Sequence, residues 1–192
     1  MPGDNVILIG FMGTGKSTVG RLLARRLGRC FVEVDEVITA REGRSIPAIF
    51  RQDGEARFRH LEGEALEALA IKSGDVIATG GGLPCQEGRM ARLRALGTVI
   101  WLKGDVQVAL ERARRSGARP MLTGRSPDEL EALYRRREPY YREAHVTLDT
   151  TGLTLDQVVS RILSRLHARR PSTRRPIAEG SRGGAPVPPP DV

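Results

Sequence analysis

Residues 6–18 read Val-Ile-Leu-Ile-Gly-Phe-Met-Gly-Thr-Gly-Lys-Ser-Thr, an apolar run followed by a glycine-rich turn. The run 6–9 predicts a buried strand, and a helical pattern begins at Thr18. Between them, residues 10–17 match the pattern G-x-x-x-x-G-K-[ST] in the context that the motif requires. Glycines let such a turn wrap closely around phosphate, and backbone amides at the helix N-terminus face the anion. The segment therefore predicts a nucleoside triphosphate site.

Each polar group of this turn has an expected task. Lys16 would reach the β- and γ-phosphates, and the Ser17 hydroxyl would ligate Mg²⁺. Of the 31 basic residues in the chain only three are lysines, so a lysine here is informative. Its ammonium is a compact charge that fits between phosphates. A glycine-rich turn without a ligand is the alternative. The expected ATP contacts of the turn are Gly13, Thr14, Gly15, Lys16, Ser17 and Thr18.

The rest of the chain alternates between strand and helix patterns. Further strands are expected at 31–34, 75–78, 98–102 and 145–148, and helices at 18–27, 55–71, 87–96, 106–115, 128–142 and 155–168. This alternation is typical of an α/β fold whose parallel sheet is covered on both faces. About forty residues separate the second and third strands, which is too long for one crossover helix and predicts an insertion. The Arg-rich interval 112–125 contains glycine and proline and predicts a mobile loop.

Composition favours one domain in a reducing compartment. The chain has 192 residues, 40% of them hydrophobic, and no apolar run of the roughly 18 residues that a membrane span needs. The N-terminus lacks the charged region of a signal peptide, and two cysteines agree with the cytoplasm. Residues 1–168 are expected to form the domain. Residues 169–192 are rich in Arg, Pro, Gly and Ser, and we expect a disordered basic tail.

The net charge of +8 allows two kinds of partner, nucleic acids or small anionic substrates. The tail 169–192 carries five arginines against two acids, which is a net +3 and leaves +5 for the first 168 residues. That body contains no basic run interleaved with aromatic residues. A moderate positive field around phosphates fits better than a nucleic-acid surface.

Two acids and a triple glycine follow predicted strands. Glu33 and Asp35 lie two residues apart at the end of the second strand, which would put them on one face. Ligands of open α/β sheets bind beyond the carboxyl ends of the strands. There, a carboxylate could hold Mg²⁺ through water or accept a proton from an attacking hydroxyl. The alternative is that Asp35 caps a helix beginning at Glu36. The glycines at 80–82 follow the third strand and would leave space and free amides for a ligand.

Five segments resemble the shikimate kinase family, in the family's order along the chain, and the resemblance covers about residues 4–168. They are GFMGTGKSTVG at 10–20, Phe58-Arg59-x-x-Glu62, ATGGG at 78–82, RPML at 119–122, and Arg137-Glu-Pro-Tyr-Tyr141-x-Glu-Ala144. The resemblance implies a three-layer P-loop NTP hydrolase fold of the nucleoside-monophosphate-kinase type. Its five-stranded parallel sheet would have the order 2-3-1-4-5. The insertion, about 34–63, would bind shikimate, and 112–125 would form a lid over ATP.

The resemblance also implies roles for single residues. Asp35 would bind the shikimate hydroxyls and deprotonate the attacking one, acting with Lys16 and Arg119 in catalysis. Arg59 and Arg137 would clamp the substrate carboxylate. The remaining expected contacts are Phe50 and Phe58 as pocket walls, Gly80, Gly81 and Gly82 as a backbone platform, and Arg115 and Arg119 on ATP. Family members usually carry Asp-x-Asp after the second strand, and this chain has Glu33-Val-Asp35. Glu33 is therefore expected to keep its water-mediated contact to Mg²⁺ with altered geometry.

The resulting hypothesis is ATP-dependent phosphorylation of shikimate to 3-phosphoshikimate in aromatic amino-acid biosynthesis. The enzyme is expected to be a cytoplasmic monomer that binds ATP, shikimate and Mg²⁺, without nucleic acid or membrane. A gluconate or nucleotide kinase would share the loop and the lid, but it would not need an arginine pair beside a triple glycine. A nucleotide-dependent nucleic-acid-binding protein is the alternative from another class.

Overall fold

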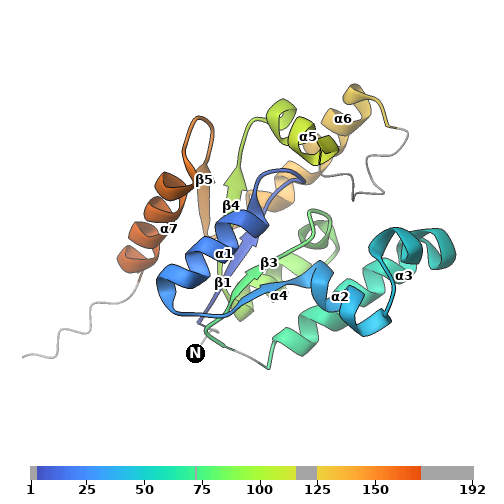
Figure 1. Cartoon of the computed structure of the whole chain (residues 1–192), viewed down its shortest axis with the longest axis horizontal. Coiled ribbons are helices and arrows are strands. Elements are labelled where there is room, and N and C mark those ends of the chain that lie inside the picture. The colour runs from blue at the N-terminus through green and yellow to red at the C-terminus, as the bar shows by residue number, and fades with distance from the viewer. Residues whose placement is uncertain (1–3, 72, 116–124, 170–192) are drawn as a thin grey trace, which may run out of the picture.

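A computed structural model describes residues 4–71, 73–115 and 125–169 of the chain. Five parallel strands form one sheet at its centre (Figure 1), with the order β2-β3-β1-β4-β5. They are β1 (Asn5–Ile9), β2 (Phe31–Glu33), β3 (Val76–Ala78), β4 (Gly97–Lys103) and β5 (Val146–Asp149). The predicted fold class and strand order are confirmed.

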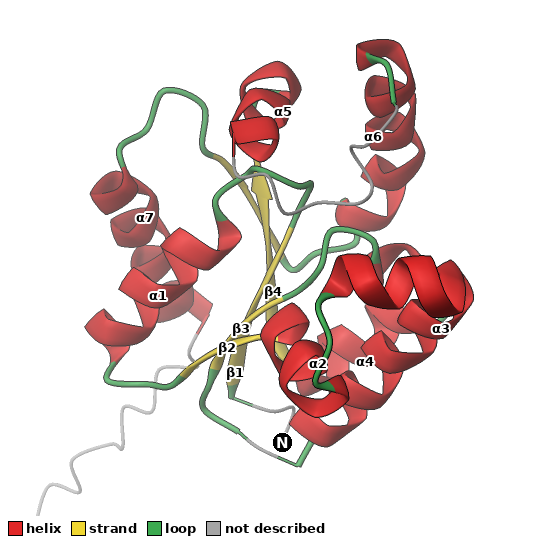
Figure 2. Ribbon diagram, turned by 45° about the vertical axis from the view of Figure 1, so that its right-hand side comes forward, coloured by secondary structure: helices red, strands yellow, loops and turns green. Residues whose placement is uncertain are grey.

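Helices cover both faces of this sheet, as Figure 2 shows. They are α1 (Lys16–Leu27), α2 (Val34–Glu42), α3 (Ile46–Leu69), α4 (Arg89–Leu96), α5 (Val106–Arg115), α6 (Pro127–Tyr141) and α7 (Leu155–Arg169), with a short 3₁₀ helix η1 (Leu83–Cys85). None of the helices within these described ranges is both long and apolar enough to cross a bilayer.

The central strand β1 shows how the sheet divides the core into two layers. Its alternate side chains point to opposite faces. Ile7 and Ile9 join a cluster with residues of α3, α4 and α6, while Val6 and Leu8 join a second cluster with residues of α1 and α7. The strand is buried along its whole length, so it must be apolar on both faces.

The interval between β2 and β3 contains two helices, α2 and α3. The predicted helix 55–71 is the second half of α3, which continues N-terminally to Ile46 across a break at Gly54 (φ 80°, ψ 175°). Ser45 caps the start of α3 by accepting a hydrogen bond from the amide of Ala48. The expected insertion, about 34–63, therefore consists of α2 and most of α3, and we call it the helical arm (Figure 2).

The prediction that Glu33 and Asp35 share a strand face is wrong, and so is the alternative that Asp35 caps a helix. Strand β2 ends at Glu33, and helix α2 begins at Val34, so Glu33 and Asp35 do not share a strand face. Asp35 does not cap that helix either, because the N-cap position is Glu33 and Asp35 lies in the first turn. The helix starts two residues earlier than predicted, because Val34 packs into the core from α2 and not from the sheet.

Some predictions fall on residues outside the described ranges. These residues include most of the predicted lid, 116–124 with Arg119, and the predicted tail from residue 170 onward. Arg115 is described only as the last residue of α5. Arg169, assigned to the tail by sequence, belongs to α7.

Candidate active site

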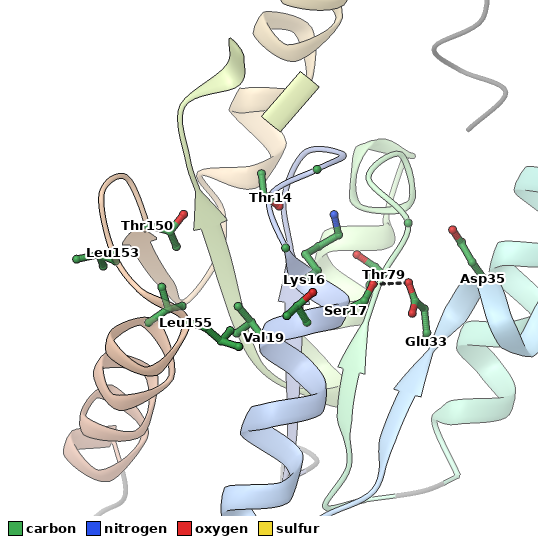
Figure 3. A pocket seen from close by; sticks show the side chains of 15 residues that line it. Thr14, Lys16, Ser17, Val19, Glu33, Asp35, Thr79, Thr150, Leu153 and Leu155 are labelled. Atoms are coloured by element: carbon green, nitrogen blue, oxygen red, sulfur yellow. Dashed lines mark hydrogen bonds between the residues drawn. The ribbon is translucent and has the colours of Figure 1, made fainter. Parts of the chain in front are cut away.

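A cavity of about 450 Å³ lies at the carboxyl ends of the strands, with the glycine-rich turn on one side. Side chains from four regions meet around it (Figure 3): the turn, the junction of β2 and α2, the end of β3, and the loop after β5. Its lining comprises Gly13, Thr14, Gly15, Lys16, Ser17, Thr18, Val19, Glu33, Asp35, Thr79, Gly80, Thr150, Leu153, Leu155 and Val158. All six predicted ATP contacts of the turn thus face one cavity.

The turn holds Lys16 inside its own curve. Lys16 is 6% exposed, and its Nζ donates hydrogen bonds of 2.9 Å each to the carbonyls of Gly10 and Phe11. Gly13 has a φ of 78°, and a Cβ there would lie 1.8 Å from the carbonyl oxygen of Ala109 in α5. A larger residue could not occupy that position, so the glycine lets the loop pack closely on α5. An ammonium beside the N-terminus of a helix is an arrangement that can bind phosphate.

Ser17 and Glu33 form the acidic side of the cavity. The Ser17 hydroxyl donates to Oε1 of Glu33 at 2.6 Å, the contact drawn as a dashed line in Figure 3. Arg21 pairs with Glu33 at 3.5 Å and with Glu36. Asp35 lines the same cavity from α2. A hydroxyl and two carboxylates are hard oxygen donors of the kind Mg²⁺ prefers beside phosphate, so these residues fit that ion.

The triple glycine lies between groups of opposite charge. A Cβ on Gly80 would lie 2.8 Å from Oε1 of Glu62 and 3.1 Å from Oδ1 of Asp35. A Cβ on Gly82 would instead lie 2.6 Å from Nη1 of Arg59. One end of the turn therefore faces carboxylates, and the other end faces a guanidinium. A side chain at Gly80 or Gly82 would have to displace these charged groups from the turn.

Gly81, in the middle, connects this turn to Arg137 and to the phosphate loop. A Cβ there would be 3.6 Å from Nη1 of Arg137, 3.3 Å from the carbonyl oxygen of Gly10 and 3.4 Å from the amide nitrogen of Met12. Arg137 comes from α6, is 8% exposed, and lies 5.9 Å from the ring centroid of Phe11. The structure thus brings Asp35, Arg59 and Arg137 to one glycine turn beside the phosphate site.

Glu62 belongs to the motif Phe58-Arg59-x-x-Glu62, but the sequence predicted no role for it. In the structure it is a hydrogen-bond partner of Arg59. It is fully buried, and its Oε2 accepts hydrogen bonds of 2.8 Å from both Arg59 and Gln86. Burial raises the pKa of Glu62, and the charge of Arg59 opposes this increase. Arg59 also pairs with Glu55, one turn earlier on α3. The spacing of one helical turn on each side of Arg59 was the signal that could have identified both acids.

The predicted pocket walls lie next to each other on α3. The rings of Phe50 and Phe58 have centroids 4.7 Å apart, and Phe58 also lies 5.4 Å from the guanidinium of Arg59. Phe58 is buried in the core, whereas Phe50 is half-buried and packs against it. Phe58 therefore supports the arginine from inside the fold.

Sequence reasoning missed the loop after β5. Thr150 and Leu153 of this loop, with Leu155 at the start of α7, line the cavity on the side away from Glu33 and Asp35 (Figure 3). The Thr150 hydroxyl and amide both donate to the carbonyl of Lys103, which fixes the loop against β4. The sequence of this loop has no recognisable ligand motif, so only its position in the fold indicates its use.

Comparison with known proteins gives a consistent result. The family described as Shikimate kinase matches residues 12–167. Curated shikimate kinases of Geobacter sulfurreducens and Moorella thermoacetica are 46% and 45% identical over 83% and 88% of this chain. The matches cover 89% and 96% of those two proteins.

Solved structures agree with the sequence relatives. A shikimate kinase from Acinetobacter baumannii, solved in complex with shikimate, has a TM-score of 0.83 and 37% identity over 87% of this chain and 94% of that one. A gluconokinase from Sinorhizobium meliloti covers 87% of the chain and 93% of its own with a TM-score of 0.55 and 21% identity, which shows a shared fold alone. With the family match spanning most of the chain and curated relatives above 40% identity, the chain belongs to the shikimate kinase family.

Proposed function

We propose that the chain transfers the γ-phosphoryl group of ATP to the 3-hydroxyl of shikimate, giving 3-phosphoshikimate and ADP for aromatic amino-acid biosynthesis. The observation that carries this proposal is the charge order along residues 80–82, with carboxylates beside Gly80 and guanidinium groups beside Gly81 and Gly82. Shikimate has hydroxyls at one end and a carboxylate at the other. It can therefore satisfy both ends of the turn at once.

Arg59 and Arg137 would bind the shikimate carboxylate. A planar guanidinium can donate two parallel hydrogen bonds to a carboxylate, which fixes the orientation of the acid as well as holding its charge. Glu62 and Glu55 hold the Arg59 side chain in place before substrate arrives. Phe50 and Phe58 would pack on the ring of the substrate. Gly80, Gly81 and Gly82 would supply backbone contacts.

Asp35 would act on the attacking hydroxyl. It lines the same cavity as the phosphate loop and has its Oδ1 beside Gly80, so a hydroxyl bound at the glycine turn could reach both Asp35 and the γ-phosphorus. As the hydroxyl oxygen forms its bond to phosphorus, its proton passes to the Asp35 carboxylate, and the bond from phosphorus to the ADP oxygen breaks. Lys16 would stabilise the charge on the β- and γ-phosphates, together with the loop amides.

Mg²⁺ would be held by Ser17 directly and by Glu33 and Asp35 through water, beside the phosphates. When bound, the ion neutralises charge on the β- and γ-phosphate oxygens. The Ser17 proton already points to Glu33, so a lone pair of the hydroxyl oxygen is available to the ion. Glu33 thereby fits the role expected of the shorter aspartate found in relatives.

Further parts of the proposal rest on the family resemblance. The helical arm 34–63 would bind shikimate and 112–125 would close over ATP, with Arg119 reaching the phosphates and Arg115 stacking on adenine. Thr150, Leu153 and Leu155 would face the nucleoside from the other side of the cavity. We further propose a cytoplasmic monomer that acts without nucleic acid or membrane, in which the residues from 170 onward are not part of the kinase domain.

The test is ADP release measured with shikimate, gluconate and nucleoside monophosphates as parallel acceptors, at saturating ATP and Mg²⁺. Turnover with shikimate alone is expected, because gluconate lacks the ring that spans the turn and a nucleotide would carry the wrong groups to Asp35. Turnover with gluconate and none with shikimate would overturn the proposal. Removing Mg²⁺ with a chelator should abolish phosphoryl transfer.

A further inference from the structure

Tyr141 makes a contact with the glycine turn that the proposed reaction does not yet use. It is the last residue of α6, has no exposed surface, and donates a hydrogen bond of 2.6 Å from its hydroxyl to the carbonyl of Gly81. Burial raises the pKa of Tyr141, so the phenol stays protonated and remains a donor at any working pH. Its ring packs on Trp101 with centroids 5.8 Å apart, which leaves the hydroxyl little freedom.

This hydrogen bond fixes the direction of a whole peptide unit. The described chain contains no cis peptide, so the carbonyl of Gly81 and the amide of Gly82 point in opposite directions. Holding the carbonyl towards α6 therefore directs the Gly82 amide away from α6. The Cys85 thiol also approaches the Gly81 carbonyl, at 3.8 Å, so the oxygen is held from two sides.

The amides of this turn are not engaged by other backbone groups. Within the described residues, no backbone hydrogen bond outside the helices and strands is donated by Gly80, Gly81 or Gly82. The Arg59 guanidinium occupies the side of Gly82 on which a Cβ would lie. Without Tyr141, rotation of the Gly81–Gly82 peptide would cost little, because glycine permits most backbone conformations.

One helix carries both partners of Gly81. Arg137 and Tyr141 are four residues apart on α6 and so lie on the same face. The guanidinium of Arg137 lies beside Gly81, while the phenol binds the carbonyl of the same glycine. A single rigid element thus sets the distance between a charged group and the amides next to it.

We propose that Tyr141 is a positioning residue for the acceptor: by anchoring the Gly81 carbonyl it holds the turn 80–82 so that its amides and Arg137 face the substrate carboxylate together. The proposal rests on the proposed function, because it assigns the turn to shikimate. The Tyr141 hydroxyl bonds to Gly81 and not to the phosphate loop itself, and it takes no part in the chemical step. Its effect should therefore appear in acceptor binding and not in transfer.

The test is Tyr141→Phe, which removes one oxygen and keeps the ring. The expected result is a KM for shikimate raised about tenfold, the effect of losing one buried hydrogen bond, with kcat and the KM for ATP within twofold of the unchanged protein. Tyr140→Phe is the matched control, because Tyr140 is the neighbouring residue on α6, is 39% exposed, and should change none of the three values. The single tryptophan, Trp101, gives a second measurement: fluorescence titration with shikimate alone should show the same loss of affinity.

Three outcomes would overturn this role. They are an unchanged shikimate KM in folded Tyr141→Phe, an equal rise in the KM for ATP, and a variant that fails to fold, since the last two assign the hydroxyl to general stability. The failure of the proposed function looks different, because the unchanged protein would then release no ADP with shikimate. Normal turnover in the unchanged protein together with a normal KM in Tyr141→Phe would reject the positioning role alone.

Discussion

Two carboxylates lie beside the same glycine, and their surroundings separate their roles. Glu62 is fully buried and has Arg59 and Gln86 as partners, so it holds other side chains in place. Asp35 lines the cavity next to the phosphate loop, where a hydroxyl can reach it. Position relative to the cavity therefore supports Asp35, and not Glu62, as the carboxylate proposed to contact the substrate.

Asp35→Asn should abolish transfer and leave ATP binding intact. The amide cannot accept the proton of the attacking hydroxyl, so kcat should fall by at least about 100-fold. ATP affinity, measured by titration calorimetry, should stay within twofold because the phosphate loop is unchanged. Asp53→Asn is the control, since Asp53 pairs with Arg44 on the helical arm and does not line the cavity. Full activity in Asp35→Asn would contradict the proposed role.

Arg59→Lys should weaken shikimate binding selectively. Lysine keeps the charge but loses the fork that can bind a carboxylate while also contacting Glu62 and Glu55. We expect the KM for shikimate to rise about tenfold or more, with the KM for ATP unchanged. Arg57→Lys, on the same helix and paired with Glu42, is the matched control. Equal kinetics for Arg59→Lys and Arg57→Lys would count against the clamp.

The two cysteines should differ sharply in reactivity. Burial raises the pKa of Cys85 to about 11, whereas Cys30 is exposed. A pH of 8 is about three units below the pKa of Cys85, so about one Cys85 thiol in a thousand is the reactive thiolate. Alkylation with iodoacetamide, followed by mass spectrometry, should give one rapid adduct at Cys30 and a slow one at Cys85 that speeds up as pH rises towards 11. Rapid labelling of Cys30→Ser at pH 8 would contradict this.

At the level of elements, the sequence predicts most accurately those helices and strands whose apolar pattern alone fixes their bounds. The strands and α5 were predicted almost to the residue, because each is set by local periodicity. The start of α2 was not, because Val34 could continue a strand or begin a helix, and only its packing in the core decides. The contact of Tyr141 with Gly81 joins residues 60 positions apart, so no local pattern could reveal it.

Helix α6 should depend on its N-terminal cap. Ser126 accepts a hydrogen bond from the amide of Glu129, and Glu129 accepts one from the amide of Ser126, which is a capping box. Ser126→Ala should cost about 1 kcal/mol of stability and lower the melting temperature by roughly 2–4 °C. Ser126→Asp should retain most of the lost stability, because aspartate also caps. Equal melting temperatures for Ser126→Ala and Ser126→Asp would show that the cap is not the cause.

For the molecule as a whole, we expect kinase activity to depend on residues 4–169, and part of the net positive charge to lie outside them. The five strands, both core clusters and the cavity all lie within residues 4–169, and the family match ends at 167. Residues 170–192 carry four arginines against two acids, which is part of the net +8. If the kinase needs only residues 4–169, then residues 170–192 act on it through long-range electrostatic attraction alone. Salt at 0.1 M screens such an attraction beyond about 10 Å.

Truncation after Arg169 should therefore leave both KM values, kcat and the melting temperature unchanged. Binding to a fluorescent polyanion such as single-stranded DNA, measured by anisotropy at low salt, should weaken, because four arginines and two acids, a net charge of +2, are lost. Some affinity for the polyanion should remain after truncation. Replacing Arg25 and Arg26 by alanine in the truncated protein should lower it further if these basic residues of α1 bind the polyanion. Loss of shikimate phosphorylation on truncation would contradict the division, and would place the C-terminal residues in the working enzyme. Tight polyanion binding that survives truncation and resists salt would instead favour a nucleic-acid role for the kinase domain itself.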